Sequence, residues 1–214
     1  MLKEYLTVGK QESFELIERK SKFIATVAHT QNIDEVTQFM DSVKSRYPDA
    51  GHHVYAYSTD HPTFLQKYSD DGEPSGTAGL PTMEAIKKNG INNVCIVVTR
   101  YFGGILLGAK GLVRAYGKCA FKGIETAGIV KMTPHIPVKF ILDYSHYGII
   151  ENFINVNRLI KGETLFGSDV ETVLTLPENQ MDLVISQIKD LTGGSVLVTK
   201  GSAQYRAVAL SLLN

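Results

Sequence analysis

The sequence predicts an α+β protein built from two domains, and three observations support this prediction. Residues 12–30 alternate apolar and polar side chains on either side of a charged turn, which is typical of an antiparallel hairpin. Near residue 133 the character of the sequence changes, because two prolines interrupt the pattern there. Beyond that point the elements follow the split-βαβ order of a ferredoxin-like domain. We therefore expect a first domain over 1–132, a linker over 133–136 and a ferredoxin-like domain over 137–214.

The elements after the hairpin follow from capping signals and periodicity. Apolar residues recur at helical spacing between Asn32 and Pro48, and Asn32 with Glu35 resembles a capping box at the start of that helix. Residues 54–59 then alternate as a strand does, and residues 64–68 have the composition of a strand paired with them. This part of the chain predicts one helix followed by a second strand pair.

The remaining elements of the first domain are marked by proline and glycine. Pro81 and Gly90 bracket a short helix, with proline expected at its first position and glycine after its end. A continuous β-branched run at 94–99 predicts a fully buried central strand. A glycine loop at 103–108 then leads into a helix that Gly128 ends.

The second domain is predicted from its element order. Two prolines so closely spaced are not expected inside a helix or a central strand, so they favour a linker before this domain. The periodicity that follows predicts strands at 138–143, 159–166, 169–176 and 195–200, and helices at 146–157 and 178–192.

Composition excludes several classes of protein. The 214 residues carry 22 basic and 22 acidic side chains, so any affinity for nucleic acid must come from a local patch. No apolar run is long enough for a membrane span, and residues 1–20 lack the apolar core of a signal peptide. Cys95 and Cys119 are far apart, which argues against a zinc site or a disulfide scaffold. We expect a cytoplasmic protein that has no membrane partner.

Four cations recur at strict i, i+4 spacing in the helix after the glycine loop. Residues at this spacing lie on one face of a helix, and like charges there destabilise an isolated helix. No acidic residue occurs within 100–122 to relieve them. A solvated helix face and a surface for an anionic partner such as phosphate both fit this pattern. The four are Lys110, Arg114, Lys118 and Lys122.

An acidic loop lies at 68–81 and has three interpretations, in descending order of preference. It can be a long turn whose Asp and Ser side chains cap its own backbone, a site for an anion or a backbone, or a site for a hard cation such as Mg²⁺. The spacing fits no EF-hand, so we expect no metal. The candidate ligand residues of the loop are Asp70, Asp71, Glu73, Ser75, Gly76 and Thr77.

The glycine loop superficially resembles a phosphate-binding P-loop but lacks the required Ser or Thr after Lys110. It still follows a buried strand and opens a basic helix, which is a favourable place for an anion. Gly103 and Gly104 would permit close approach of a ligand, and Arg100 and Tyr101 would border it. We expect these four residues, together with the four helix cations, to bind the anionic partner, and we expect no catalytic residue and no cofactor.

The run from Tyr68 to Ala120 contains the uncommon segments DDGEPSGTAG, VVTRYFGG and LGAKGLVRAY. It resembles the signature core of the IMPACT family, specifically its bacterial YigZ/YvyE-type members. The resemblance implies a first domain of the ribosomal protein S5 domain 2-like type, akin to domain IV of elongation factor G. It implies a second domain like domain V of that factor.

The resemblance says less about activity. Eukaryotic members of the family regulate translation initiation by competing for the activator of a starvation-sensing kinase. They carry a different accessory domain, so that partner is not carried over to this chain. The bacterial members resemble translation-linked proteins that bind nucleic acid, and the family supplies no catalytic residue.

We therefore expect a non-enzymatic, translation-linked regulatory protein that binds RNA or a ribosomal component through the basic helix and the glycine loop. Phosphate contacts would give affinity for RNA without specificity for its base sequence. One alternative is a metal-dependent hydrolase or phosphotransfer enzyme that uses the acidic residues at 70–73. Another is a protein-docking adaptor whose second domain provides the docking face.

Overall fold

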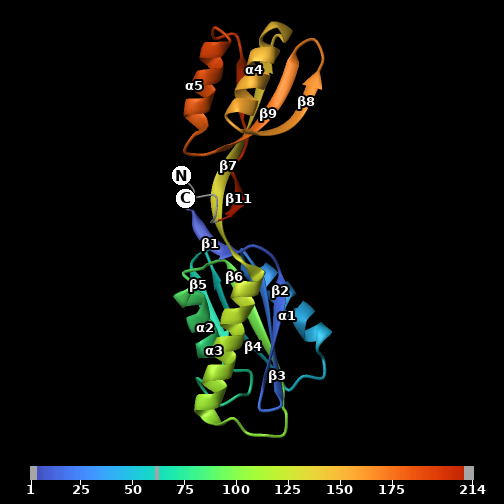
Figure 1. Cartoon of the computed structure of the whole chain (residues 1–214), viewed down its shortest axis with the longest axis vertical. Coiled ribbons are helices and arrows are strands. Elements are labelled where there is room, and N and C mark those ends of the chain that lie inside the picture. Colours follow the sequence, from blue (N-terminus) through green and yellow to red (C-terminus); the bar gives the residue numbers. More distant parts are fainter. Residues whose placement is uncertain (1–3, 61–62, 210–214) are drawn as a thin grey trace. The chain divides into compact units, whose positions relative to one another are not determined.

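The computed structural model describes residues 4–60 and 63–209 of the chain (Figure 1). In these residues the chain forms two β-sheets and five helices, which confirms the predicted α+β class. It divides into two compact units, of which the first comprises residues 5–131 and the second chiefly residues 132–207. None of the helices in the described ranges is both long and apolar enough to cross a membrane.

The first unit is organised around a five-stranded antiparallel sheet. The strand order is β2-β3-β6-β4-β5. Its central strand, β6, pairs with β3 on one side and β4 on the other, and every residue from Val94 to Arg100 is buried. The buried strand predicted at 94–99 is therefore confirmed. The strands are β2 (Glu12–Glu18), β3 (Ser21–His29), β4 (His52–Thr59), β5 (Leu65–Ser69) and β6 (Val94–Tyr101).

Three helices cover the two faces of this sheet (Figure 1). Helix α1 (Ile33–Arg46) packs its apolar face against one side, while α2 (Gly79–Lys88) and α3 (Gly108–Ala127) pack against the other. The larger core lies under α2 and α3, where Tyr116 meets Phe23 edge to face with ring centroids 5.1 Å apart. A short strand, β1 (Tyr5–Val8), precedes the sheet.

Local signals explain where the helices begin and end. The side chain of Asn32 accepts a hydrogen bond from the Glu35 N–H at 2.9 Å, so the predicted N-cap of α1 is confirmed. Helix α2 begins at Gly79, and Pro81 is therefore its third residue rather than its first. Gly128 follows α3 with a φ of +71°, which an L side chain rarely adopts.

The second unit contains the predicted order of strands and helices. Its strands β10, β7, β9 and β8 lie side by side in that order and pair antiparallel, and β11 also pairs with β7. Helices α4 and α5 pack their apolar faces into one core with these strands. The elements are β7 (Ile129–Leu142), α4 (Tyr144–Val156), β8 (Ile160–Phe166), β9 (Val170–Pro177), α5 (Met181–Leu191), β10 (Leu197–Lys200) and β11 (Gln204–Ala209).

The structure differs from the linker expected at 133–136, because these residues form the middle of strand β7. The two prolines fit into the strand as hydrogen-bond acceptors. The Pro134 carbonyl accepts from the Glu178 N–H at 3.0 Å, and the Pro137 carbonyl accepts from the Gly201 N–H at 2.8 Å. A proline is compatible with a strand wherever its nitrogen does not have to donate.

Candidate functional site

The acidic loop between β5 and α2 is organised by one of its own carboxylates. Asp70 accepts hydrogen bonds from the backbone N–H groups of Gly76 at 2.9 Å, Ala78 at 3.0 Å and Gly79 at 2.8 Å. Burial opposes ionisation of Asp70, but these three donors together hold its pKa below the usual value. Asp70 therefore caps its own loop and the start of α2, as the preferred interpretation predicts.

Two other candidate residues of this loop, Asp71 and Thr77, also form hydrogen bonds within the protein. The Thr77 hydroxyl donates to the Pro74 carbonyl at 2.6 Å, whereas Ser75 is exposed. The Asp71 carboxylate accepts from the backbone N–H of His53 at 2.6 Å. The loop carboxylates therefore point to separate partners. Within residues 4–60 and 63–209, no three His, Cys, Asp or Glu side chains are grouped so that they could hold a metal ion.

The third carboxylate, Glu73, joins the three signature segments in a buried cluster. Its Oε1 accepts from Arg100 Nη1 and from the Tyr116 hydroxyl, both at 2.6 Å. The side chains of Glu73 and Arg100 are only 3% and 7% exposed. Burial, and then the hydrogen bond to Glu73, raise the pKa of the Tyr116 hydroxyl far above its usual value.

Arg100 therefore does not play the role predicted for it as a phosphate ligand. Its guanidinium carbon lies 5.3 Å from the centroid of the Phe23 ring and 5.6 Å from that of Phe102, and its charge is matched by Glu73. The neighbouring Tyr101, also predicted to bind the anion, donates its hydroxyl to Asp49 Oδ1 at 2.9 Å. Both residues support the fold at this end of the sheet.

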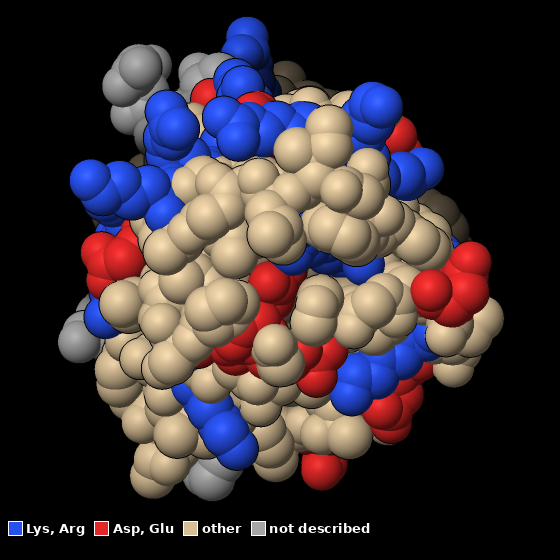
Figure 2. Space-filling model, turned by 90° about the horizontal axis from the view of Figure 1, so that it is seen from below, with Lys and Arg blue, Asp and Glu red and all other residues tan. Residues whose placement is uncertain are grey.

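In the space-filling view from below, acidic side chains lie in a hollow among uncharged residues, while basic side chains gather along one border (Figure 2). The hydrogen bonds explain why several loops meet at this end of the first unit. The carbonyl of Arg100 accepts from the Gly51 N–H at 3.1 Å, and Nδ1 of His52 lies 2.7 Å from the Asp71 carbonyl. In the space-filling view the acidic hollow and the basic border lie on the same face of the molecule (Figure 2).

The glycine loop between β6 and α3 packs tightly against the β2–β3 turn. The Gly103 N–H donates to Ser21 Oγ at 3.1 Å, and a Cβ at Gly103 would lie 2.0 Å from the backbone carbon of Lys20. The close approach predicted at Gly103 is thus made by the chain itself and not by a ligand. Gly104 is exposed and adopts a φ of +80°, with open space around it.

The basic face of α3 is exposed along its whole length, at Lys110, Arg114, Lys118 and Lys122. One of these cations has an acidic partner, because Lys122 Nζ lies 2.5 Å from Glu125 Oε2 one turn away. The absence of acidic residues within 100–122 therefore does not leave Lys122 unpaired, because its partner lies three residues beyond that range. Three cations of the stripe, from Lys110 to Lys118, form no ion pair within the described residues.

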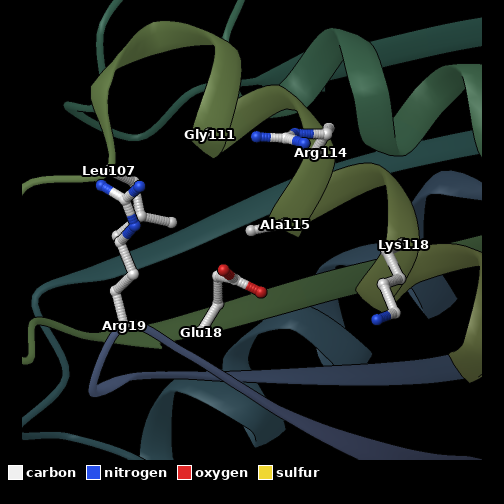
Figure 3. Close-up of a pocket in the computed structure, with 7 residues that line it drawn as sticks. All are labelled: Glu18, Arg19, Leu107, Gly111, Arg114, Ala115 and Lys118. Carbon is white, nitrogen blue, oxygen red and sulfur yellow. The ribbon is translucent and has the colours of Figure 1, made fainter.

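The β2–β3 turn and α3 enclose a pocket of 220 Å³, which we call the cationic pocket (Figure 3). It brings Arg114 and Lys118 of the stripe together with Arg19 of the turn, while Lys110 lines a shallower depression alongside. The seven residues that line the cationic pocket are Glu18, Arg19, Leu107, Gly111, Arg114, Ala115 and Lys118.

Sequence reasoning missed Arg19 and Glu18 as site residues. The signal for them is the charged hairpin turn, in which Arg19 and Lys20 have φ values of 45° and 65° and Glu18 pairs with Ser21. A two-residue turn of this kind matches the twist of the hairpin strands. Only the packing of α3 against β2 and β3 places the turn beside the stripe.

The second unit carries an aromatic cluster on its surface. The ring of Phe166 lies 5.4 Å from that of Tyr147 and 6.4 Å from that of Tyr144, and Phe166 is 60% exposed. That this unit docks a protein partner stays a prediction.

Comparisons with known proteins place these features in context. The sequence profile described as the Impact N-terminal domain matches residues 19–124. The chain is 34% identical over 211 residues to "IMPACT family member YvyE" of Bacillus subtilis (strain 168), covering 99% of this chain and 97% of that protein. It is 41% identical over 118 residues to "IMPACT family member YigZ" of Escherichia coli (strain K12), covering 54% and 58%.

A solved structure also matches nearly the whole chain. It is titled "Crystal structure of an hypothetical protein" and superposes with a TM-score of 0.61 at 28% sequence identity. The match covers 92% of this chain and 97% of that one. The similarity therefore extends over both units.

Proposed function

This chain belongs to the IMPACT family, and from that premise we propose that it is a translation-linked regulatory protein that binds RNA, free or within the ribosome, at its cationic pocket. The observation that carries the proposal is the convergence of Arg19, Arg114 and Lys118 on one pocket. These cations come from two elements that are about a hundred residues apart in sequence, so the cluster is a product of the fold.

The electrostatics of the pocket favour a polyanion. Unrelieved cations at i, i+4 spacing cost helix stability, and Lys110, Arg114 and Lys118 form no ion pair within the described part of the chain that would offset this cost. A phosphate backbone would relieve the repulsion and release its own counterions. The zero net charge of the chain makes this local patch the main source of attraction for nucleic acid.

The alternative of a metal-dependent hydrolase finds less support. Such an enzyme would need the carboxylates of the acidic loop to converge on a cation. Asp70 is instead engaged with three backbone N–H groups, and Glu73 is engaged with Arg100 and Tyr116. We therefore assign the acidic loop to the support of the fold.

Binding of a fluorescein-labelled single-stranded RNA, followed by anisotropy between 50 and 300 mM salt, tests the proposal. Each phosphate contact to a single strand contributes about −0.7 to the slope of log affinity against log salt. The triple variant Lys110→Gln, Arg114→Gln, Lys118→Gln should bind more weakly, and its slope should flatten by about 2. Its folding stability should stay level or rise slightly, because three mutually repelling charges are removed.

A matched control changes the same number of charges elsewhere in the first unit. Arg46→Gln, Lys67→Gln and Lys88→Gln alter exposed cations of α1, β5 and α2. The control should keep the affinity and the slope of the parent. Equal losses in both triple variants, or parent binding that does not depend on salt, would contradict the assignment of the cationic pocket.

A further inference from the structure

The cationic pocket contains a carboxylate that a simple phosphate site would not need. Glu18 is the last residue of β2, and it lines the pocket together with Arg114, Lys118 and Arg19. In Figure 3 its carboxylate points toward α3, into the space between the side chains of Arg19 and Lys118. Within the described residues, this carboxylate forms no ion pair and accepts no hydrogen bond. It is therefore available to a ligand.

An unpaired carboxylate restricts which ligands the pocket can hold. A phosphate oxygen placed beside Glu18 would be repelled, so a ligand made only of phosphate gains nothing from this residue. An ionised carboxylate is an acceptor only. The ligand that satisfies the whole pocket must therefore present anionic oxygens to the cations and, next to them, a hydrogen-bond donor to Glu18.

Two kinds of donor occur in a nucleic acid, namely base N–H groups and the ribose 2′-hydroxyl. A base that is read by a protein usually stacks on an aromatic side chain or an Arg plane. No aromatic side chain lines this pocket, and its two arginines, Arg19 and Arg114, are the groups expected to contact phosphate rather than to stack on a base. At 220 Å³ it is also smaller than the ~300–1,000 Å³ of typical small-molecule sites. These features favour a sugar–phosphate unit over a base.

The chemistry of RNA supplies that pair of groups at the required spacing. The 2′-hydroxyl and the 3′-phosphate are attached to adjacent carbons of one ribose, so a donor lies directly beside the anionic oxygens. DNA has the phosphate but lacks the donor. The 2′-hydroxyl is the group by which a protein tells RNA from DNA at a given site.

We propose that Glu18 accepts a hydrogen bond from a ribose 2′-hydroxyl while Arg19, Arg114 and Lys118 bind the adjacent phosphate, so that the pocket selects RNA over DNA. This inference rests on the function proposed above. It makes Glu18 a specificity-determining residue, because it adds affinity only when the hydroxyl is present and opposes the phosphate when it is absent.

The fold holds Glu18 in place for this role. Its pairing partner in the hairpin, Ser21, is fully buried, and Ser21 Oγ accepts from the Gly103 N–H at 3.1 Å. The glycine loop thereby clamps the turn against the start of α3. The backbone of the turn is therefore held beside α3 before a ligand arrives, so that only the Glu18 side chain has to be ordered on binding.

The test compares three single strands of one U-free sequence, made as RNA, as DNA and as 2′-fluoro RNA. The fluorine keeps the RNA-like sugar but removes the donor. The parent protein should bind RNA about tenfold more tightly than 2′-fluoro RNA, which corresponds to about 1.4 kcal/mol, because the fluorine cannot donate the hydrogen bond to the charged Glu18. Glu18→Ala should remove this preference and leave DNA binding unchanged or tighter.

Asp41→Ala serves as the matched control, since it removes one exposed carboxylate from α1 on the opposite face of the sheet. It should keep the preference of the parent for RNA. Equal parent affinities for RNA and 2′-fluoro RNA would overturn the inference while leaving the proposed function intact. An equal tightening of RNA and DNA binding in Glu18→Ala would also overturn it, because Glu18 would then act only by repulsion. A parent protein that binds none of the three strands would refute the proposed function itself.

Discussion

Removal of the Glu73 charge should destabilise the first unit more than any surface change. In Glu73→Gln the side chain keeps its shape, but Arg100, whose side chain is 7% exposed, loses its counter-charge. Breaking a buried pair in this way costs about 3–5 kcal/mol, because an uncompensated charge is left in the interior. Tyr116→Phe should cost less, about 1.5–3 kcal/mol, since it removes one hydrogen bond to a charged group and leaves the pair intact.

The stability of the first unit can be measured by labelling its two cysteines with a thiol reagent. Cys95 and Cys119 are free thiols buried in that unit, and burial raises the pKa of Cys119 to about 12 and that of Cys95 further. A thiol reagent therefore labels them only when the unit opens. A loss of 3–5 kcal/mol should speed labelling of Cys95 in Glu73→Gln by roughly 100- to 4,000-fold under conditions where reclosing is fast.

The exposed ion pair between Glu84 and Lys87 serves as a control for the buried pair of Glu73 and Arg100. Glu84→Gln removes one partner of the Glu84–Lys87 pair on the surface of α2, which should cost about 0–1 kcal/mol. The double variant Glu73→Leu, Arg100→Met should label more slowly than Glu73→Gln, because it leaves no buried charge. Labelling of Glu73→Gln at the rate of Glu84→Gln would refute the reasoning.

Three further predictions use the same labelling of Cys95 or urea denaturation. Asp70→Asn should show its full loss of stability relative to the parent at pH 7 and a smaller one below about pH 4. The folded-state pKa of Asp70 is lowered, so its ionised form stabilises the fold above the unfolded-state pKa, and this contribution disappears as the pH falls through the folded-state pKa. An equal loss of stability at pH 3 and pH 7 would contradict this. Gly103→Ala should cost about 1–3 kcal/mol through its clash with the β2–β3 turn, whereas Gly148→Ala in α4, with open space around it, should be neutral or stabilising when assayed by denaturation. Asn32→Ala should cost about 1 kcal/mol through loss of the α1 cap, and no change in labelling rate would count against the cap.

Elements set by neighbouring residues could be predicted from the sequence. The start of α1 depends on Asn32 and Glu35, three positions apart, and the end of α3 depends on Gly128, so both are encoded locally. The exposure of the stripe on α3 also follows from spacing alone. The order of strands and helices in the second unit was predictable for the same reason.

Contacts between distant residues could not be predicted. The burial of Arg100 depends on Glu73, 27 residues earlier, and on the register of β6 between two strands. The joining of Arg19 to the stripe likewise depends on how α3 packs on the sheet. The residues expected to form a linker lie in strand β7 instead. Whether a proline fits into a strand depends on which neighbouring segment its nitrogen faces, and the local sequence pattern does not show this.

The central position of β6 has a consequence for the order in which the chain folds. Its partners β3 and β4 end at His29 and Thr59, so the ribosome completes both well before it reaches Tyr101. At about 5–20 residues per second, the pairing edge of β3 waits on the order of 4–14 s for β6 to be made. During that interval β3 can pair with β2 and β4 with β5, but each strand lacks the partner that β6 provides, so the β3–β6 and β4–β6 ladders, which join residues far apart in sequence, form last. Chaperone capture of nascent chains should therefore peak for lengths between these points and fall once β6 has left the exit tunnel.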